Sequence, residues 1–355
     1  MSNTAKPAAI ISADPWSLEQ ARTELLAAAP GARVLAQLGE GELLAALPGS
    51  FWELAERWQQ RGPIFIRHVN PVQETTPLPA GEGAEHTTDA LRDLALERFA
   101  PLMEPDLPFS VQTRIFANVS YGPYDVNTAL AEALQDESGA PLDVRDPEQI
   151  LSVVIAHYEG QLTAFLGLSP VAYNLSDWAG GKRRYRRGKE QISRSEFKLL
   201  EALEVFGIEL PPRGVALDLG AAPGGWTRIL RQQEQYVTAV DPGELDRSLQ
   251  ADPDIRHKQT TAEEYLEVGP DQFDLIVNDM RLDARDSARL MVEYAPFLYR
   301  DGQAIMTLKL PEENQEPIID HAFNILRQAY TIAGARQLFH NRSEVTVWLR
   351  RAGTG

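Results

Sequence analysis

The chain has 355 residues, 43% of them hydrophobic, and a formal net charge of −17. This length suits two or three domains that each bury a core, and the apolar content argues against disorder. The chain contains no cysteine, which excludes disulfides, thiolate metal sites and mechanisms with a cysteine nucleophile, such as cysteine-dependent methylation of a pyrimidine carbon.

Smaller features of the sequence disfavour other classes of protein. No apolar run approaches the ~20 residues that a membrane-spanning helix needs, and the first residues lack the basic start of a signal peptide. We therefore expect a cytoplasmic protein with no membrane partner. Six histidines are scattered without the short spacing of a zinc motif, so no metal is expected. The negative charge disfavours loose binding of nucleic acid over the whole surface, because phosphate contact needs clustered Lys and Arg.

The first part of the chain, residues 1–70, has the pattern of a small α+β domain. Apolar periodicity predicts a strand, a helix, a hairpin, a helix and a strand, at 8–12, 17–29, 33–38 with 42–47, 51–60 and 64–69. The order β-α-β-β-α-β is that of a ferredoxin-like domain. Residues 71–87 are rich in Pro, Thr, Gly and Glu, which predicts a linker.

Residues 88–170 predict a second α+β domain. We expect helices and strands in the order helix, strand, helix, strand, strand, at 88–100, 109–116, 125–135, 150–157 and 161–168. The stretch Pro-Leu-Asp-Val-Arg-Asp-Pro-Glu-Gln-Ile at 141–150, which leads into the paired strands, resembles the closing half of a THUMP domain, a module that presents RNA to modification enzymes. Without this resemblance the segment is a small acidic α/β domain.

A basic linker is expected at residues 171–192. Six cations surround Tyr185, and we expect them to bind RNA phosphates: Lys182, Arg183, Arg184, Arg186, Arg187 and Lys189. The alternatives are a solvated basic loop or an intramolecular partner for the acidic N-terminal half.

From residue 193 onward, strands and helices alternate in a doubly wound α/β pattern. Seven strands are predicted at 215–219, 236–240, 256–260, 273–278, 304–310, 335–338 and 344–350. The last two form a hairpin. This arrangement suits the Rossmann-like sheet of a class I methyltransferase.

The loop from Asp218 to Trp226, with the sequence Asp-Leu-Gly-Ala-Ala-Pro-Gly-Gly-Trp, joins an apolar strand to a helix. Glycines let the backbone approach a ligand, and the helix start offers unpaired N–H groups. The loop departs from the G-x-G-x-x-G dinucleotide motif, and Asp218 suits a cationic or zwitterionic ligand such as S-adenosylmethionine. Asp241, ending the next strand, stands where an acidic residue binds ribose hydroxyls. For a bare glycine loop, the alternative is an ordinary tight turn.

Four further residues are predicted near the same sheet edge. Lys198 lies on the helix before the first strand, Asp279 ends the fourth strand, Lys309 ends the fifth and Glu344 begins the seventh. Ligands bind at the carboxyl edge of such sheets, and a lysine in an apolar strand is unusual without a partner. Taken singly, each has a structural alternative, as an exposed helix lysine, a loop cap, a surface strand end and an exposed edge residue.

Lys-Asp-Lys-Glu in this order resembles the FtsJ-like family of RNA ribose 2'-O-methyltransferases. The Ser-Arg-Ser run at 193–195, the glycine loop, Asp279-Met280 and the Arg-Ser-Glu turn at 342–344 match it too. Within the family, Leu-Lys-Leu-Pro at 308–311, Ala-Arg-Gln-Leu-Phe-His at 335–340 and the two preceding domains resemble the type that methylates a cytidine ribose of large-subunit rRNA.

The resemblance implies S-adenosylmethionine as cofactor and rRNA as partner, with Lys198, Asp279, Lys309 and Glu344 catalytic. Together with the loop, it gives a set of expected cofactor contacts, namely Ser195, Asp218, Gly220, Ala222, Pro223, Gly224, Gly225, Trp226, Asp241, Thr261 and Asp279. In one place the sequence departs from the family, because Thr260-Thr261-Ala262 stands where the family often has an aspartate that holds the adenine.

Methyl transfer to a ribose hydroxyl needs a positioned base, since this hydroxyl is too weak an acid to ionise near neutral pH. Lys309 is the expected base. Desolvation and a nearby Lys198 favour its neutral form, whereas Asp279 and Glu344 favour its protonated form, and the sequence leaves the balance open. The carboxylates are expected to orient the two ammonium groups and to keep Lys198 charged beside the developing alkoxide.

Three other functions are possible for a chain with this type of sheet. A base-directed amine methyltransferase would have Pro-Pro-aromatic after the fourth strand, where this chain has Asn-Asp-Met-Arg at 278–281. A dehydrogenase is disfavoured by the loop pattern. A ribosome assembly factor that binds RNA and retains the fold without turnover stays as the alternative.

Overall fold

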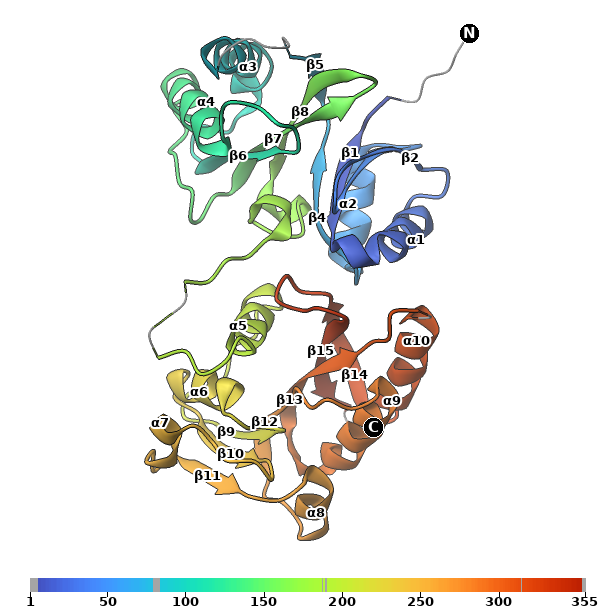
Figure 1. The fold of residues 1–355 in the computed structure, drawn as a ribbon, viewed down its shortest axis with the longest axis vertical. Coiled ribbons are helices and arrows are strands. Elements are labelled where there is room, and N and C mark those ends of the chain that lie inside the picture. The colour runs from blue at the N-terminus through green and yellow to red at the C-terminus, as the bar shows by residue number, and fades with distance from the viewer. Residues whose placement is uncertain (1–5, 79–83, 187, 189, 314, 353–355) are drawn as a thin grey trace. The chain divides into compact units, whose positions relative to one another are not determined.

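The computed structural model describes residues 6–78, 84–186, 188, 190–313 and 315–352. The chain divides into two compact units, an N-terminal unit of residues 1–182 and a C-terminal unit of residues 183–355 (Figure 1). Short 3₁₀ turns are η1 (Pro15–Ser17), η2 (Ala100–Leu102), η3 (Val171–Tyr173), η4 (Ala179–Gly181) and η5 (Ala295–Phe297).

The first sheet of the N-terminal unit is antiparallel throughout and has the order β2-β3-β1-β4. Its strands are β1 (Ala9–Ala13), β2 (Arg33–Gly39), β3 (Glu42–Ala46) and β4 (Ile66–Pro71), and its helices are α1 (Leu18–Ala28) and α2 (Phe51–Gln60). Helix α2 begins where the Ser50 hydroxyl accepts a hydrogen bond from the Glu53 N–H, and it buries Leu54 and Trp58.

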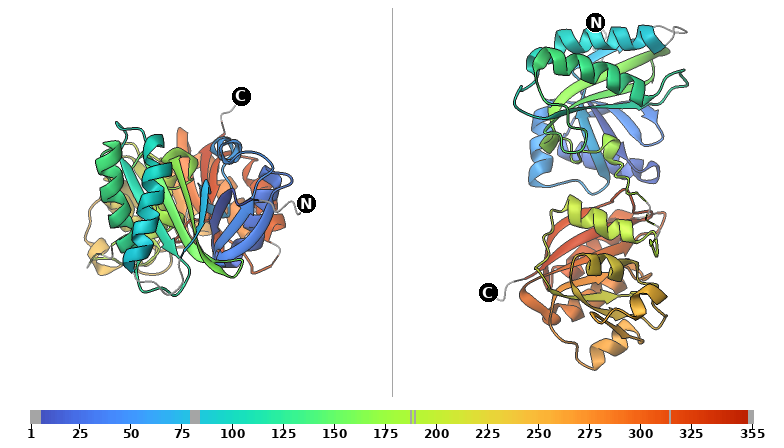
Figure 2. Two further views of the ribbon diagram at one scale, coloured as in Figure 1. Left: turned by 90° about the horizontal axis from the view of Figure 1, so that it is seen from above. Right: turned by 90° about the vertical axis from the view of Figure 1, so that its left-hand side faces the viewer.

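The second sheet of this unit has the order β5-β8-β7-β6, with β6 and β7 parallel. It contains β5 (Glu74–Pro77), β6 (Phe109–Ile115), β7 (Gln149–Tyr158) and β8 (Gln161–Pro170), with helices α3 (Ala84–Arg98) and α4 (Pro123–Ser138). The two helices lie side by side over this sheet (Figure 2). Strand β5 falls within the predicted linker. Its two threonines favour extended backbone, and a proline at its end is tolerated because β5 is an edge strand.

Both sheets share one apolar cluster that includes Ile10, Leu44, Val154 and Phe165. Beside it, Arg114 on β6 reaches the first sheet and donates hydrogen bonds to Glu42 and to Asn70, at 2.6 Å each. Arg114 is 8% exposed and Glu42 1%, so this ion pair is buried between the two sheets.

The C-terminal unit is built on a seven-stranded sheet of order β11-β10-β9-β12-β13-β15-β14, which confirms the predicted mixed α/β fold. The strands are β9 (Val215–Leu219), β10 (Tyr236–Val240), β11 (Ile255–Lys258), β12 (Phe273–Asn278), β13 (Leu298–Lys309), β14 (Tyr330–Arg336) and β15 (Glu344–Arg351). Strand β15 runs antiparallel to both of its neighbours, β13 and β14, whereas the strands from β11 to β13 are parallel to one another. Strand β14 starts earlier than the predicted 335–338. A bulge between Ile332 and Gly334 interrupts the alternation of side chains by which a strand is recognised in the sequence.

Helices cover both faces of this sheet. Figure 1 shows α5 (Glu196–Val205) and α6 (Gly225–Gln232) on one side and α9 (Ala284–Tyr294) and α10 (Gln315–Leu326) on the other. Two shorter helices are α7 (Arg247–Gln250) and α8 (Ala262–Glu267). Within the described part of the chain, no helix has the length and apolar character needed to cross a membrane.

Candidate active site

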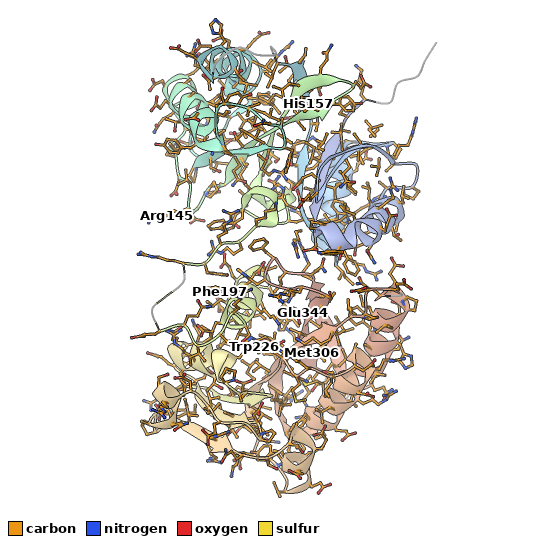
Figure 3. The ribbon with its side chains drawn as sticks, viewed as in Figure 1. Arg145, His157, Phe197, Trp226, Met306 and Glu344 are labelled. Atoms are coloured by element: carbon orange, nitrogen blue, oxygen red, sulfur yellow. The ribbon has the colours of Figure 1, made fainter. Side chains whose placement is uncertain are left out.

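A cavity of about 1180 Å³ opens at the carboxyl end of β9, where the strand order reverses between β10 and β12. Such switch points are where open α/β sheets bind ligands. Figure 3 labels three residues that line the cavity, Phe197 on α5, Trp226 on α6 and Glu344 at the start of β15. The volume exceeds the roughly 300–1,000 Å³ of a typical site for one small ligand.

The glycine loop forms one wall of this cavity, and two of its glycines leave no space for a side chain. Gly220 has a φ of 76°, and a Cβ atom there would lie 2.3 Å from the Met280 Cγ. A Cβ atom on Gly225 would lie 2.2 Å from the Ser193 Oγ. A side chain at either position would have to displace Met280 or Ser193, so these glycines let the loop pack closely against the neighbouring chain.

Two carboxylates support the loop. Asp218 is 1% exposed and accepts a hydrogen bond from the Thr227 hydroxyl at 2.6 Å. Burial raises the pKa of Asp218 to about 7, against the lowering effect of the Thr227 hydroxyl. Asp241 accepts hydrogen bonds from the backbone N–H groups of Ala222, at 3.1 Å, and Gly243, at 2.7 Å. These bonds fix the turn of the loop around Asp241.

The four predicted catalytic residues come together in this cavity as a ring of alternating charge. Lys198 contacts Asp279 at 3.2 Å and Glu344 at 2.5 Å. Lys309 contacts Asp279 at 2.5 Å and also pairs with Glu344. The Thr307 hydroxyl donates a further hydrogen bond to Asp279 at 2.7 Å. Two ammonium groups and two carboxylates thus balance each other's charge.

The ring is recessed from solvent, and this shapes its titration. Burial alone would raise the pKa of Asp279, but attraction to Lys309 and Lys198 outweighs it and holds the pKa below its usual value. Burial likewise would lower the pKa of Lys309, but Asp279 and Glu344 outweigh it and raise the pKa. The balance that the sequence left open is therefore in favour of a protonated Lys309.

Two buried glutamates on α5 were missed by sequence reasoning. Glu196 accepts hydrogen bonds from the N–H groups of Ile192, at 2.6 Å, and Ser193, and pairs with Arg228 at 2.8 Å. Glu201 accepts hydrogen bonds from the N–H groups of Phe339 and His340, at 2.7 and 2.9 Å. Glu201 follows Phe197 by four residues and so lies on the buried face of α5, a signal that the sequence contained.

The basic segment is only partly arranged as expected. Arg184 lines the cavity and Arg186 is exposed, whereas Lys182 is half-buried. Arg183 pairs with Glu204 at 2.8 Å and lies over the ring of Tyr185. Two members of the predicted RNA-binding set, Arg187 and Lys189, lie outside the described residues.

Most of the expected cofactor contacts line the cavity. They are Ser195, Asp218, Gly220, Ala222, Pro223, Trp226 and Asp279. Gly224 and Gly225 lie behind this wall at the start of α6. Thr261 instead caps α8, where its hydroxyl accepts a hydrogen bond from the Glu264 N–H at 3.2 Å. Among the described residues, no group of three or more His, Asp or Glu side chains is arranged to hold a metal ion.

Comparison with known proteins identifies the family. Residues 191–330 match the FtsJ-like methyltransferase family. Ribosomal RNA large subunit methyltransferase M of Halorhodospira halophila is 35% identical over 209 residues, 58% of this chain and 59% of its own length. In the alignments with several such relatives, the chain spans little more than half of their length. Among solved structures, TrmN of Thermus thermophilus shares 18% identity over 98% of this chain and 100% of its own, with a TM-score of 0.41.

Two longer alignments cover both units. The methyltransferase M of Marinobacter nauticus is 30% identical over 324 residues, 86% of each chain. That of Idiomarina loihiensis is 33% identical over 311 residues, 82% of this chain and 74% of its own. The chain therefore belongs to the ribosomal RNA large subunit methyltransferase M family of FtsJ-like methyltransferases.

Proposed function

We propose that this protein is an S-adenosylmethionine-dependent RNA ribose 2'-O-methyltransferase that acts on large-subunit rRNA. The observation that carries the proposal is the ring of Lys198, Asp279, Lys309 and Glu344 in a cavity beside a glycine loop. A hydroxyl that is too weak an acid to ionise alone requires such positioned amines and carboxylates.

The cofactor of the family is S-adenosylmethionine, which supplies a methyl group on a positively charged sulfur. The loop fits such a ligand, since Gly220 lines the cavity without a side chain and a buried carboxyl, Asp218, lies beside it. Ser195 and Trp226 would complete this side of the site, with the Trp226 indole held by a hydrogen bond to the Ser195 carbonyl at 2.8 Å. Asp241 would bind ribose hydroxyls.

Lys309 is the proposed general base. Its amine accepts the hydroxyl proton only when neutral, and Asp279 and Glu344 raise its pKa, so a small neutral fraction carries the reaction near neutral pH. Lys198, which contacts the same two carboxylates, stabilises the alkoxide that develops on the ribose. Asp279 and Glu344 orient both amines.

The N-terminal unit is proposed to dock the RNA. The strand order β2-β3-β1-β4 supports a ferredoxin-like domain at residues 1–70. Residues 88–170 are proposed as a THUMP-like RNA-binding domain, after the segment 71–87, and residues 171–192 as the basic connection to the methyltransferase domain, 193–355. A cytoplasmic location follows from an rRNA substrate.

The experiment that tests the function compares the wild-type protein with Lys309→Ala. Each is incubated with labelled methyl donor and large-subunit rRNA, and 2'-O-methyl positions are mapped. We expect transfer to one ribose by the wild type and a loss of roughly 10²–10⁴-fold in the variant. Lys258→Ala, which removes a lysine from the end of β11, is the matched control. Transfer by Lys309→Ala at the wild-type rate would remove Lys309 as base. RNA binding without any transfer would instead favour a non-catalytic assembly factor.

A further inference from the structure

The rim of the cavity carries four arginines from four separate segments. Arg184 precedes α5 within the basic segment, Arg194 lies just before α5, Arg281 follows β12 and Arg342 precedes β15. All four side chains are exposed. Within the described part of the chain, none of these guanidinium groups pairs with a carboxylate, unlike Arg183 and Arg228 nearby.

The charge of this rim contrasts with that of the whole protein. The chain carries a net charge of −17, yet the cavity is lined by six basic and only three acidic residues. The three acidic residues are Asp218, Asp279 and Glu344, and none of them is exposed. The rim is therefore cationic, and such a cluster is the electrostatic footprint of phosphate groups.

The chain next to two of these arginines, Arg184 and Arg342, is anchored by contacts with α5. The Tyr185 ring stacks on Phe197, with centroids 5.5 Å apart, and its hydroxyl donates to Glu204 at 2.8 Å. These contacts hold the backbone next to Arg184. On the same side, Glu201 of α5 accepts hydrogen bonds from the N–H groups of Phe339 and His340 and so fixes the loop that leads to Arg342. Arg184 and Arg342 thus project from anchored backbone.

The depth of the site restricts the form of RNA that reacts there. The side chains of Lys309, Asp279 and Glu344 are 24%, 16% and 6% exposed, so the reacting hydroxyl must enter the cavity to reach them. A cavity of about 1180 Å³ has space for a methyl donor and one nucleotide but not for a duplex. Enzymes with recessed sites act on nucleotides that are unpaired or extruded.

We propose that Arg184, Arg194, Arg281 and Arg342 bind the phosphates on both sides of one unpaired RNA nucleotide, whose ribose enters the cavity. This inference rests on the proposed function. Of the four arginines, Arg184 belongs to the sequence run at 182–189, whereas Arg194, Arg281 and Arg342 come from segments that the fold brings together. Arg183, occupied by Glu204 and Tyr185, supports the wall instead of the RNA.

The test measures binding of a single-stranded RNA oligonucleotide to the full chain by fluorescence anisotropy over a series of KCl concentrations. For single strands, each phosphate contact contributes ~0.7 to the slope of log affinity against log salt concentration. Arg281→Ala and Arg342→Ala should each weaken binding severalfold and reduce the slope by about 0.7, and the double variant by about 1.4. Lysine at either position should restore much of the slope, because it keeps the charge.

Arg300→Ala is the matched control. It removes an exposed arginine of the same unit from the opposite end of β13 and should leave the slope unchanged. Wild-type affinity and slope in Arg281→Ala and Arg342→Ala would overturn the proposal. An equal loss of affinity for a duplex of the same sequence would overturn its restriction to unpaired RNA.

Failure of the rim and failure of the proposed function are distinguishable. The first is measured as RNA affinity in Arg281→Ala and Arg342→Ala, and the second as methyl transfer by the wild type. If the wild type transfers no methyl group but the rim variants still lose affinity, the proposed enzyme activity is wrong and phosphate binding by the rim is supported. If transfer occurs and the rim variants bind normally, the enzyme activity is supported and phosphate binding by the rim is wrong.

Discussion

Lys309 and Glu344 occupy directly opposed positions on β13 and β15, and their side chains form an ion pair. The pairing depends on strand direction. Because β15 runs antiparallel to β13, its first residue lies beside the last residue of β13, at the edge where the other parallel strands also end. A parallel β15 would place Glu344 at the far edge of the sheet. The reversal of one strand thus completes the ring of charges.

The rate of methyl transfer should rise with pH. Asp279 and Glu344 raise the pKa of Lys309 above its usual value, so the neutral amine that accepts a proton is scarce at neutral pH. Below this pKa, kcat should increase about tenfold per pH unit, measured in single turnovers between pH 6.5 and 9.5.

Asp279→Asn provides the internal test of that assignment. It removes one of the two negative charges that raise the pKa of Lys309. The dependence of the methyl-transfer rate on pH should therefore shift to lower pH, even though the maximal rate falls. A profile that is flat in the wild type, or unmoved in Asp279→Asn, would contradict proton transfer to Lys309 as the cause.

Gly220→Ala should impair both folding and donor binding. Gly220 has a φ of 76°, and its Cβ would meet the Met280 Cγ at 2.3 Å, so alanine adds a steric clash to an unfavourable backbone conformation. Gly269 has a φ of 77° with no atom within 4 Å of its would-be Cβ. Gly269→Ala therefore measures the backbone cost alone, about 1 kcal/mol. Urea unfolding and calorimetric titration with S-adenosylmethionine compare the two, and equal effects would show that the approach of Met280 does not matter.

Asp218→Asn should stabilise the fold at alkaline pH. The pKa of Asp218 is raised from 3.8 to about 7 by burial. A raised carboxyl pKa contributes stability at low pH that is lost as pH rises through the folded value. Asparagine does not ionise, so its advantage in free energy of unfolding should grow by about 2–3 kcal/mol between pH 5 and pH 8.

The measurement for Asp218 is urea unfolding at both pH values, with donor affinity determined in parallel. We expect Asp218→Asn to bind S-adenosylmethionine more weakly while it gains stability, because the proposed role of this carboxyl is to contact the ligand. A stability difference that does not change with pH would show that Asp218 titrates normally.

The parts of the site that depend on short stretches of sequence could be predicted. Strands β9, β10 and β12 match the predicted bounds, and Lys198 and Glu344 could be placed because each adjoins a recognisable motif. The rim could not be predicted, because Arg194, Arg281 and Arg342 are brought together only by the strand order. The protonation state of Lys309 could not be predicted either, since it depends on the distances between the four charged groups of the ring. Strand β5 was missed because an edge strand tolerates Pro and Thr that also mark linkers.

Breaking the buried ion pair of the N-terminal unit should destabilise that unit alone. Arg114→Leu leaves the Glu42 carboxylate, 1% exposed, without its 2.6 Å partner, which costs about 3–5 kcal/mol. Adding Glu42→Leu should recover much of this loss, because no charge then remains buried. Arg92→Ala, which breaks an exposed pair with Asp89, should cost only about 0–1 kcal/mol.

Hydrogen–deuterium exchange reports these effects separately for the two units. In Arg114→Leu, peptides covering β1 and β3 should exchange faster than in the wild type, whereas peptides covering β9 and β12 should be unchanged. This contrast follows because Arg114 donates its hydrogen bonds to Ser12, Glu42 and Asn70, all in the first sheet of the N-terminal unit. Faster exchange in β9 and β12 as well would mean that the two units unfold together, and wild-type exchange in β1 would mean that the pair contributes nothing to holding the two sheets of the N-terminal unit together.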